Sequence, residues 1–240
     1  MSKVKVLILL AFLLGFYNNV KAQTEDEVIE RYLESIGGIT QLKTVSSVFS
    51  EGKFQYQGNE FPFKTYAKSP GFYKIEIGKP ATPFVQSYDG RAGWRIDGFN
   101  NNSKLVLLKG GAALSFPNGA EVELESPFID YRKKGNIPEL VSKEKVGDRE
   151  CLKMKLTRKS GKIEYYFFDG ITAHLLLKQS QVKMAGKLVW VDTYFSDFRK
   201  IENLLIPFKT ERKVKDEVIS VATTDKLELN TEIAESQFLP

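Results

Sequence analysis

The sequence predicts a mainly β fold of the α+β type, built around one large, curved antiparallel sheet with a few helices. Three observations support this. From Val45 onward, apolar residues recur at every second position in runs rich in aromatic and β-branched side chains, which is the period of a strand. Turn dipeptides such as Asp89-Gly90 and Gly147-Asp148 interrupt these runs about every ten residues. One segment with helical periodicity precedes them.

The first 22 residues have the three parts of a secretory signal peptide. Lys3 and Lys5 supply a charged start, residues 6–16 are apolar, and a small residue, Ala22, ends the segment. The apolar run is about half of the ~20 residues that a membrane-spanning helix needs. We therefore expect cleavage after Ala22 and a soluble mature chain, residues 23–240, that forms a single domain outside the cytoplasm.

The composition excludes several classes of protein. A chain of 240 residues that is 42% hydrophobic and 27% charged can build a core, so it is not mainly disordered. Its single cysteine, Cys151, excludes an intrachain disulfide, and with one histidine, His174, it leaves no ligand set for zinc. Removing the three lysines of the leader from 35 basic residues leaves 32 against 30 acidic ones. Without a basic stripe, we expect no nucleic-acid partner.

The mature chain is predicted to open with an amphipathic helix. Thr24 with Glu27 three residues later forms a capping box. The Gly37-Gly38 pair ends the helix, because glycine adopts the left-handed cap conformation without a Cβ clash. Its apolar stripe consists of Val28, Ile29, Tyr32, Leu33 and Ile36. A second, short helix is predicted within 126–135, with Ser126 as cap and Pro127 in its first position.

About eleven strands follow the first helix, and within each of them the alternation separates two faces. In residues 151–156, Leu152 and Met154 share one side, while Lys153 shares the other with Cys151. One face of the sheet is therefore apolar and the other polar. The clearest strands are residues 72–77, 84–88, 91–97, 140–146, 151–156, 163–168, 175–183, 188–195 and 218–229.

The apolar face is too large for the predicted helices to cover. About eleven strands at ~4.8 Å spacing and ~23 Å length give a face of about 1,200 Å². A thirteen-residue helix shadows only about 200 Å², so three helical pieces leave about half of the face uncovered. The sheet must either curl until its own side chains meet, as in a closed barrel or sandwich, or curl partly and leave a pocket for an apolar ligand.

Several stretches, in order along the mature chain, carry a family resemblance. They are Gly37-Gly38 with Leu42 and Val45, the segment 85–94 (VQSYDGRAGW), the segment 126–131 (SPFIDY), and the segment 194–199 (YFSDFR) running on to Ile206-Pro207-Phe208. Together they resemble the LolA-like periplasmic carriers of outer-membrane lipoproteins, in particular the group found in Bacteroidetes-type bacteria. The resemblance implies a half-open barrel with helices as a lid over a hydrophobic cavity that takes acyl chains. It also implies a periplasmic monomer that meets inner-membrane loading and outer-membrane accepting proteins.

We expect the cargo to lie against large apolar side chains of the sheet. The expected cavity-lining residues are Phe54, Tyr56, Phe63, Tyr73, Ile75, Phe84, Trp94, Met154, Tyr165, Trp190 and Tyr194. Carriers of this family tether the lid through an arginine on an early strand, and here Lys74 stands nearest to that position. Lysine lacks the planar fork of donors that arginine has. The lid contact is therefore expected to differ, and a lipid other than a lipoprotein is an alternative cargo.

Enzyme signatures are absent from the sequence. It contains no G-x-S-x-G, H-E-x-x-H or G-x-G-x-x-G motif and no phosphate-binding loop. His174 is expected to be a half-exposed strand residue, and Cys151 has no partner visible in the sequence. We therefore predict a carrier without catalytic residues, metal or cofactor. An alternative is a regulatory domain that resembles the RseB-type sensors, which bind misfolded envelope proteins or lipopolysaccharide.

Overall fold

The computed structural model describes residues 23–78, 82–100, 102–108, 126–184 and 186–240. The predicted signal peptide therefore lies outside the described residues. The strands, in chain order, are β1 (Ser47–Tyr56), β2 (Asn59–Lys68), β3 (Phe72–Ile77), β4 (Phe84–Tyr88), β5 (Gly93–Asp97), β6 (Asn102–Leu108), β7 (Ile137–Val146), β8 (Arg149–Thr157), β9 (Ile163–Asp169), β10 (Leu175–Met184), β11 (Lys187–Ile201), β12 (Leu204–Val214) and β13 (Glu217–Leu229).

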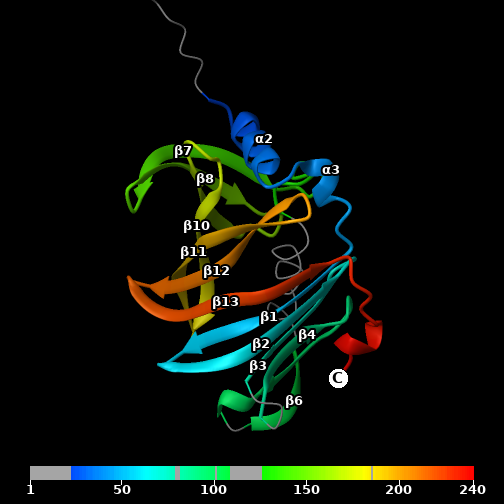
Figure 1. The fold of residues 1–240 in the computed structure, drawn as a ribbon. Coiled ribbons are helices and arrows are strands. Elements are labelled where there is room, and N and C mark those ends of the chain that lie inside the picture. The colour runs from blue at the N-terminus through cyan, green and yellow to red at the C-terminus, as the bar shows by residue number, and fades with distance from the viewer. Residues whose placement is uncertain (1–22, 79–81, 101, 109–125, 185) are drawn as a thin grey trace, which may run out of the picture.

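These thirteen strands form one antiparallel sheet (Figure 1). Its order is β6-β5-β4-β3-β2-β1-β13-β12-β11-β10-β9-β8-β7, so β1 pairs with β13 and the described sheet ends at β6 and β7. The prediction of a mainly β fold with one open, curved sheet is confirmed, while the count of about eleven strands was too low. One strand outside the clearest predicted runs is β12, in which Pro207 interrupts an apolar run, a feature that argues against a strand.

Helix α2 (Glu25–Ser35) confirms the predicted first helix and its capping box. The Thr24 hydroxyl accepts a hydrogen bond from the Glu27 amide at 3.3 Å, and the Glu27 carboxylate accepts one from the Thr24 amide at 2.9 Å. The chain then turns at Gly37, where φ is +123° and a Cβ would lie 2.5 Å from the Asn203 carbonyl oxygen. Only glycine fits this contact, and a short helix, α3 (Ile39–Leu42), follows it.

Replacing Thr24 with alanine is expected to lower the free energy of unfolding by about 1 kcal/mol, because it removes one of two reciprocal caps from α2. Urea unfolding followed by circular dichroism measures this change. Thr24→Ser keeps the hydroxyl and should stay within about 0.3 kcal/mol of the original protein. Equal losses in both variants would contradict a role for the hydroxyl.

The predicted helix within 126–135 was wrong, because this segment forms a series of turns. The Ile129 amide bonds to the Ser126 carbonyl and the Gly135 amide to the Arg132 carbonyl, both three residues back. Asp130 has a φ of +49°, which a right-handed helix cannot contain. The turns bring Phe128 and its neighbours onto the sheet beside α2.

The larger core cluster lies between α2, these turns and the strands β7 to β10. Its buried members are Val28, Ile29, Tyr32, Leu33, Phe128, Ile129, Tyr131, Leu152, Met154, Leu156, Tyr166 and Phe168. The ring of Phe128 contacts those of Tyr32, Tyr166 and Phe168 at centroid distances of 5.9, 4.9 and 5.5 Å. Helix α2 therefore covers one end of one face of the sheet.

The face that α2 covers is the inside of the curve, and we call it the concave face. Strand β3 is four strands away from β12, about 19 Å along a flat sheet at ~4.8 Å per strand. Burial of the guanidinium lowers the pKa of Arg212 on β12. Tyr73 on β3 nevertheless acts on the same group and opposes this shift electrostatically. The two side chains approach one another only if the sheet curves toward this side, as Figure 1 shows.

The C-terminal segment lies on the opposite, convex face. It ends in a turn of 3₁₀ helix, η2 (Glu235–Phe238), whose Phe238 is fully buried. The Phe238 carbonyl accepts hydrogen bonds from the Trp94 indole at 2.8 Å and the Ser87 hydroxyl at 2.9 Å. Trp94 is therefore a structural residue beneath the C-terminal segment.

Candidate ligand-binding face

The concave face carries an aromatic cluster at the end away from α2. The strand register places Phe54, Tyr56, Phe63, Tyr73, Ile75 and Phe84 on this face, together with Met154 at the α2 end. Phe99 reaches over the cluster from a 3₁₀ turn, η1 (Gly98–Asn100). Its ring lies 5.6 Å from Tyr56, 5.1 Å from Phe61 and 5.7 Å from Phe84. Phe99 and Phe61 were not among the predicted site residues.

Sequence reasoning missed Phe99 because it lies in a turn, where alternation carries no information. The available signal was Gly98, a turn-forming residue directly after a strand. A Cβ there would lie 2.2 Å from the Thr82 carbonyl oxygen, so the turn can pass this close to the backbone only with glycine. This close approach places the Phe99 ring over β1, β2 and β4.

The aromatic cluster is less enclosed than the core under α2. Phe63 is buried, but Phe54, Tyr56, Tyr73, Ile75, Phe84 and Phe99 are each only half-buried. Met154, by contrast, has no exposed surface and lies inside the core cluster. Among the described residues, the helical cover is therefore concentrated at the β7 to β10 end, and the aromatic end of the concave face stays open to partial contact with solvent.

The other predicted site residues lie on the convex face, so the expectation that all of them line one cavity was wrong. Trp94 pairs with Ser87, on the opposite side of the sheet from Phe84. Tyr165 contacts Trp190 at 5.7 Å, and Trp190 is 42% exposed. Tyr194 lies under the Lys213 ammonium at 4.8 Å. Each of these aromatic residues has a ring contact or a cation–π contact on the convex face.

Lys74 also lies on the convex face, away from α2, so the predicted lid contact was wrong. Its ammonium forms an ion pair with Glu76 at 2.8 Å and lies 5.7 Å from the Trp94 ring. Lys74 therefore contributes to the packing near the C-terminal segment. The physical reason is parity: its neighbours Tyr73 and Ile75 point to the concave face, so Lys74 points outward.

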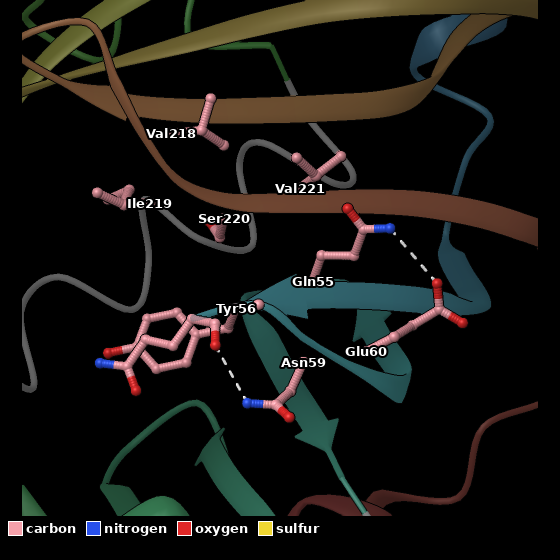
Figure 2. Close-up of a pocket in the computed structure, with 10 residues that line it drawn as sticks. Gln55, Tyr56, Asn59, Glu60, Val218, Ile219, Ser220 and Val221 are labelled. Carbon is pink, nitrogen blue, oxygen red and sulfur yellow. Dashed lines mark hydrogen bonds between the residues drawn. The ribbon is translucent and has the colours of Figure 1, made fainter.

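A pocket of about 310 Å³ opens at the rim of the concave face, where the β1–β2 hairpin meets β13 (Figure 2). It is lined by residues 55–60 and 218–221, which include Tyr56 and Ser220. Its hydrogen bonds are local, from Asn59 to the Gln57 carbonyl at 3.1 Å and from Gln55 to Glu60 at 3.4 Å. The volume is at the lower end of the range for small-molecule sites. Of the predicted site residues, only Tyr56 lines it.

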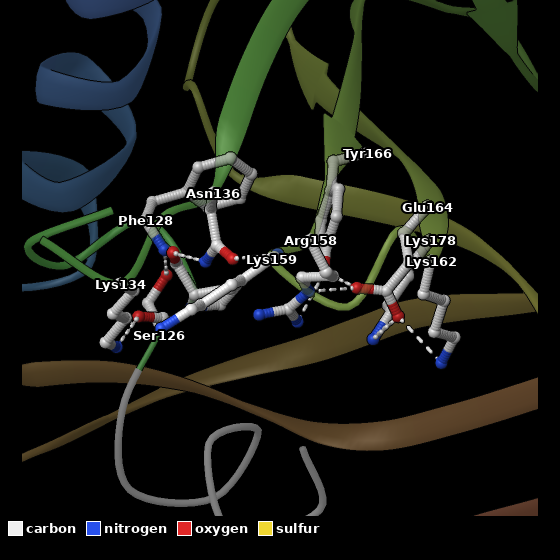
Figure 3. Close-up of polar contacts among 11 residues, drawn as sticks. Ser126, Phe128, Lys134, Asn136, Arg158, Lys159, Lys162, Glu164, Tyr166 and Lys178 are labelled. Atoms are coloured by element: carbon white, nitrogen blue, oxygen red, sulfur yellow. Dashed lines mark hydrogen bonds and ion pairs between the residues drawn. The ribbon is translucent and has the colours of Figure 1, made fainter. Parts of the chain in front are cut away.

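A buried charged cluster lies on the concave face between the core and this open end (Figure 3). The Glu164 carboxylate is 1% exposed. It forms ion pairs with the Arg158 guanidinium at 2.6 Å and with the ammonium groups of Lys178 at 3.1 Å and Lys162 at 3.2 Å. The Tyr166 hydroxyl donates to the same carboxylate at 3.0 Å. The two lysines contact the Oε1 atom, which nevertheless accepts no well-aligned hydrogen bond. Three cations thus share one carboxylate.

The pKa values in this cluster follow from burial and charge. Burial alone would raise the pKa of the Glu164 carboxyl, but the charges of Lys178, Arg158 and Lys162 outweigh burial and hold that pKa far below its usual range. Burial lowers the pKa of Lys178 even though Glu164 opposes this. Burial also raises the pKa of the Tyr166 hydroxyl. Glu164 is therefore an anion at neutral pH, and Tyr166 is neutral.

His174 and Cys151 lie apart from this cluster. His174 is half-buried directly before β10, its ring lies 5.0 Å from Phe198, and burial lowers its pKa. Cys151 is 1% exposed on the convex face. Burial raises its pKa, so the reactive thiolate form is less populated at neutral pH. The described residues contain no group of three or more His, Cys, Asp or Glu side chains placed to hold a metal ion.

The sequence matches no family model and no curated protein. Solved structures do match. A DUF1329 family protein from Desulfovibrio piger has a TM-score of 0.60 at 16% identity, over 90% of this chain and 98% of that one. The LolA superfamily protein NE2245 from Nitrosomonas europaea has a TM-score of 0.57 at 14% identity, over 91% and 99% of the two chains. This chain has the LolA-like fold.

A third LolA-like match is a domain from Vibrio parahaemolyticus described as an outer membrane lipoprotein-sorting protein domain. It has a TM-score of 0.55 at 11% identity and covers 89% of this chain and 95% of that one. The fold implied by the resemblance in the sequence is thereby confirmed. Within the described residues, no helix is long and apolar enough to cross a bilayer.

Proposed function

We propose that this protein is a periplasmic carrier that binds lipid acyl chains against the concave face of its LolA-like sheet. One observation carries the proposal: large aromatic side chains at the β1 to β4 end are only half-buried, while α2 covers the other end. Half-buried rings around Phe99 offer an apolar surface that a hydrocarbon chain can cover. Lipid or lipoprotein sorting toward the outer membrane is the transport that this binding would serve.

The energetics support a carrier without a chemical step. Burying a sixteen-carbon chain at ~0.8 kcal/mol per CH₂ yields on the order of 10 kcal/mol, which holds a lipid in solution. The fold likeness to the Vibrio parahaemolyticus domain described as lipoprotein-sorting supports the same class of role. The predicted signal peptide, cleavage after Ala22 and the transient loading and accepting proteins at the two membranes belong to this proposal. The RseB-type sensor stays a prediction.

The proposal predicts that the purified protein binds a fluorescent fatty acid, cis-parinaric acid. A triacylated lipopeptide should compete for the same site and displace the probe. Phe84→Gln is expected to weaken uptake about tenfold, because it removes apolar contact from the concave face. The fluorescence of the probe measures the affinity. The matched control, Trp190→Gln, changes an exposed aromatic residue on the convex face and should leave the affinity unchanged.

Failure of the original protein to take up the fatty acid and the lipopeptide would reject the carrier function. Equal losses in Phe84→Gln and Trp190→Gln would reject the concave face as the site.

A further inference from the structure

A row of cross-strand neighbours runs along the concave face, from buried core residues through charged residues to the residues of the rim pocket. The strand register aligns Met154, Tyr166, Lys178, Thr193, Arg212, Ser220, Tyr56 and Asn59, one from each strand from β8 through β13 to β2. The row begins in the core beneath α2 and ends in the rim pocket, which Ser220, Tyr56 and Asn59 line. Arg212 is the residue directly before the pocket.

Arg212 is a cation of the concave face that has no ion-pair partner among the described residues. Lys178, which lies two strands away from Arg212, pairs with Glu164. The cross-strand neighbours of Arg212 are Thr193 and Ser220, which are uncharged. No carboxylate of the described residues forms an ion pair with its guanidinium.

The position of Arg212 is costly for a cation without a partner. The side chain is half-buried, and burial lowers its pKa, while among the described residues Tyr73 favours its charged form. A guanidinium removed from water is stabilised by an oxyanion held through two parallel hydrogen bonds. Thr193 and Ser220 flank it with hydroxyl groups that can donate to the same oxyanion.

We propose that Arg212 is a headgroup subsite that binds the oxyanion of an acidic lipid, a carboxylate or a phosphate, while the acyl chain lies against the aromatic cluster. The geometry fits this arrangement. Arg212 and Tyr56 are two strands apart, about 10 Å at ~4.8 Å per strand, and Phe99 lies next to Tyr56. An acyl chain spans half of a ~30 Å hydrocarbon core, about 15 Å, and so reaches from one to the other.

This inference rests on the proposed function and narrows its cargo. The triacylated cysteine of a lipoprotein has no acid group near its acyl chains, so it would leave Arg212 unpaired. A fatty acid or an anionic phospholipid pairs it. The inference therefore favours an acidic lipid over a lipoprotein as the cargo.

The test compares cis-parinaric acid with its methyl ester, which has the same chain and no charge. The original protein is expected to bind the acid about tenfold more tightly than the ester. Arg212→Met should abolish this preference by weakening the acid alone, and Arg212→Lys, which keeps the charge but not the fork, should retain part of it. The matched control is Lys209→Met on the convex side of the same strand, which should retain the full preference.

The outcomes separate the headgroup subsite from the proposed function. Tight binding of the acid and the ester without preference, or an unchanged preference in Arg212→Met, would overturn the subsite while leaving the carrier function standing. If the original protein binds neither probe, the carrier function itself fails. Displacement of the acid by phosphatidylglycerol vesicles supports a lipid phosphate as cargo, whereas displacement by fatty acid alone supports a carboxylate. Equal displacement by inorganic phosphate would overturn the lipid headgroup role.

A thermal unfolding measurement distinguishes ligand binding from a structural role of Arg212. Because no described residue forms an ion pair with the guanidinium, Arg212→Met should leave the melting temperature unchanged or higher. A melting temperature lowered by more than about 5 °C would mean that the guanidinium stabilises the fold, and the preference is then judged on Arg212→Lys alone.

Discussion

Replacing Glu164 with glutamine is expected to lower the free energy of unfolding by about 3–5 kcal/mol, because breaking a buried ion pair leaves charge uncompensated. Arg158, Lys162 and Lys178 all contact this one carboxylate, which is 1% exposed. Glutamine keeps the shape of the side chain, so the loss reports the charge. Urea unfolding at pH 7, followed by circular dichroism, measures the change.

The control for this prediction is Glu139→Gln. Glu139 pairs with Lys155 at 2.7 Å, and its side chain is 51% exposed. An exposed ion pair contributes about 0–1 kcal/mol, so the control should stay within that range. A loss below 1 kcal/mol for Glu164→Gln would show that the three cations find sufficient compensation elsewhere.

The same carboxylate predicts how stability depends on pH. The folded state holds the pKa of Glu164 far below its ordinary value of 4.5, so its contribution is complete above about pH 4.5 and is lost as the pH falls below it. Asp169 acts in the same direction: burial would raise its pKa, but hydrogen bonds from backbone amides and from Arg149 lower it to about 2. The stability of the original protein should therefore fall between pH 4.5 and 2. Glu164→Gln should show a shallower fall.

Alternation within a strand could be predicted from the sequence, and so could most strand positions. The segments 72–77 and 84–88 match β3 and β4, and Cys151 does lie on the side of Lys153. Local composition alone determines both features, because side chains alternate strictly along a strand. The capping box of α2 is local in the same sense.

Which face of one strand joins which face of the next could not be predicted, because it depends on pairing and bulges. The register shifts between Glu51 and Gly52 where β1 meets β13, and a one-residue shift moves side chains to the other face. Most of the predicted cavity-lining residues were therefore chosen because they are large and aromatic, without knowledge of the face on which they lie. Size did not reveal that Trp94 and Trp190 lie outside, or that Arg212 lies inside.

The turn segment around Phe128 offers the second large effect. Phe128 is 2% exposed, and its ring is enclosed by those of Tyr32, Tyr166 and Phe168. Replacing it with alanine leaves a cavity between α2 and the sheet, which is expected to cost about 3–5 kcal/mol in the free energy of unfolding. The matched control is Phe198→Ala on the half-buried ring beside His174, which should cost clearly less.

Helix α2 is the element that should loosen first when this cavity forms. Tyr32 on α2 contacts Phe128 directly, so the cavity should loosen α2 before it loosens β8 and β9, whose hydrogen bonds lie within the sheet. In Phe128→Ala, hydrogen exchange should therefore accelerate more for α2 amides than for those of β8 and β9. If all of these amides accelerate equally, α2 does not open as a separate unit, and a movable lid is excluded for this helix.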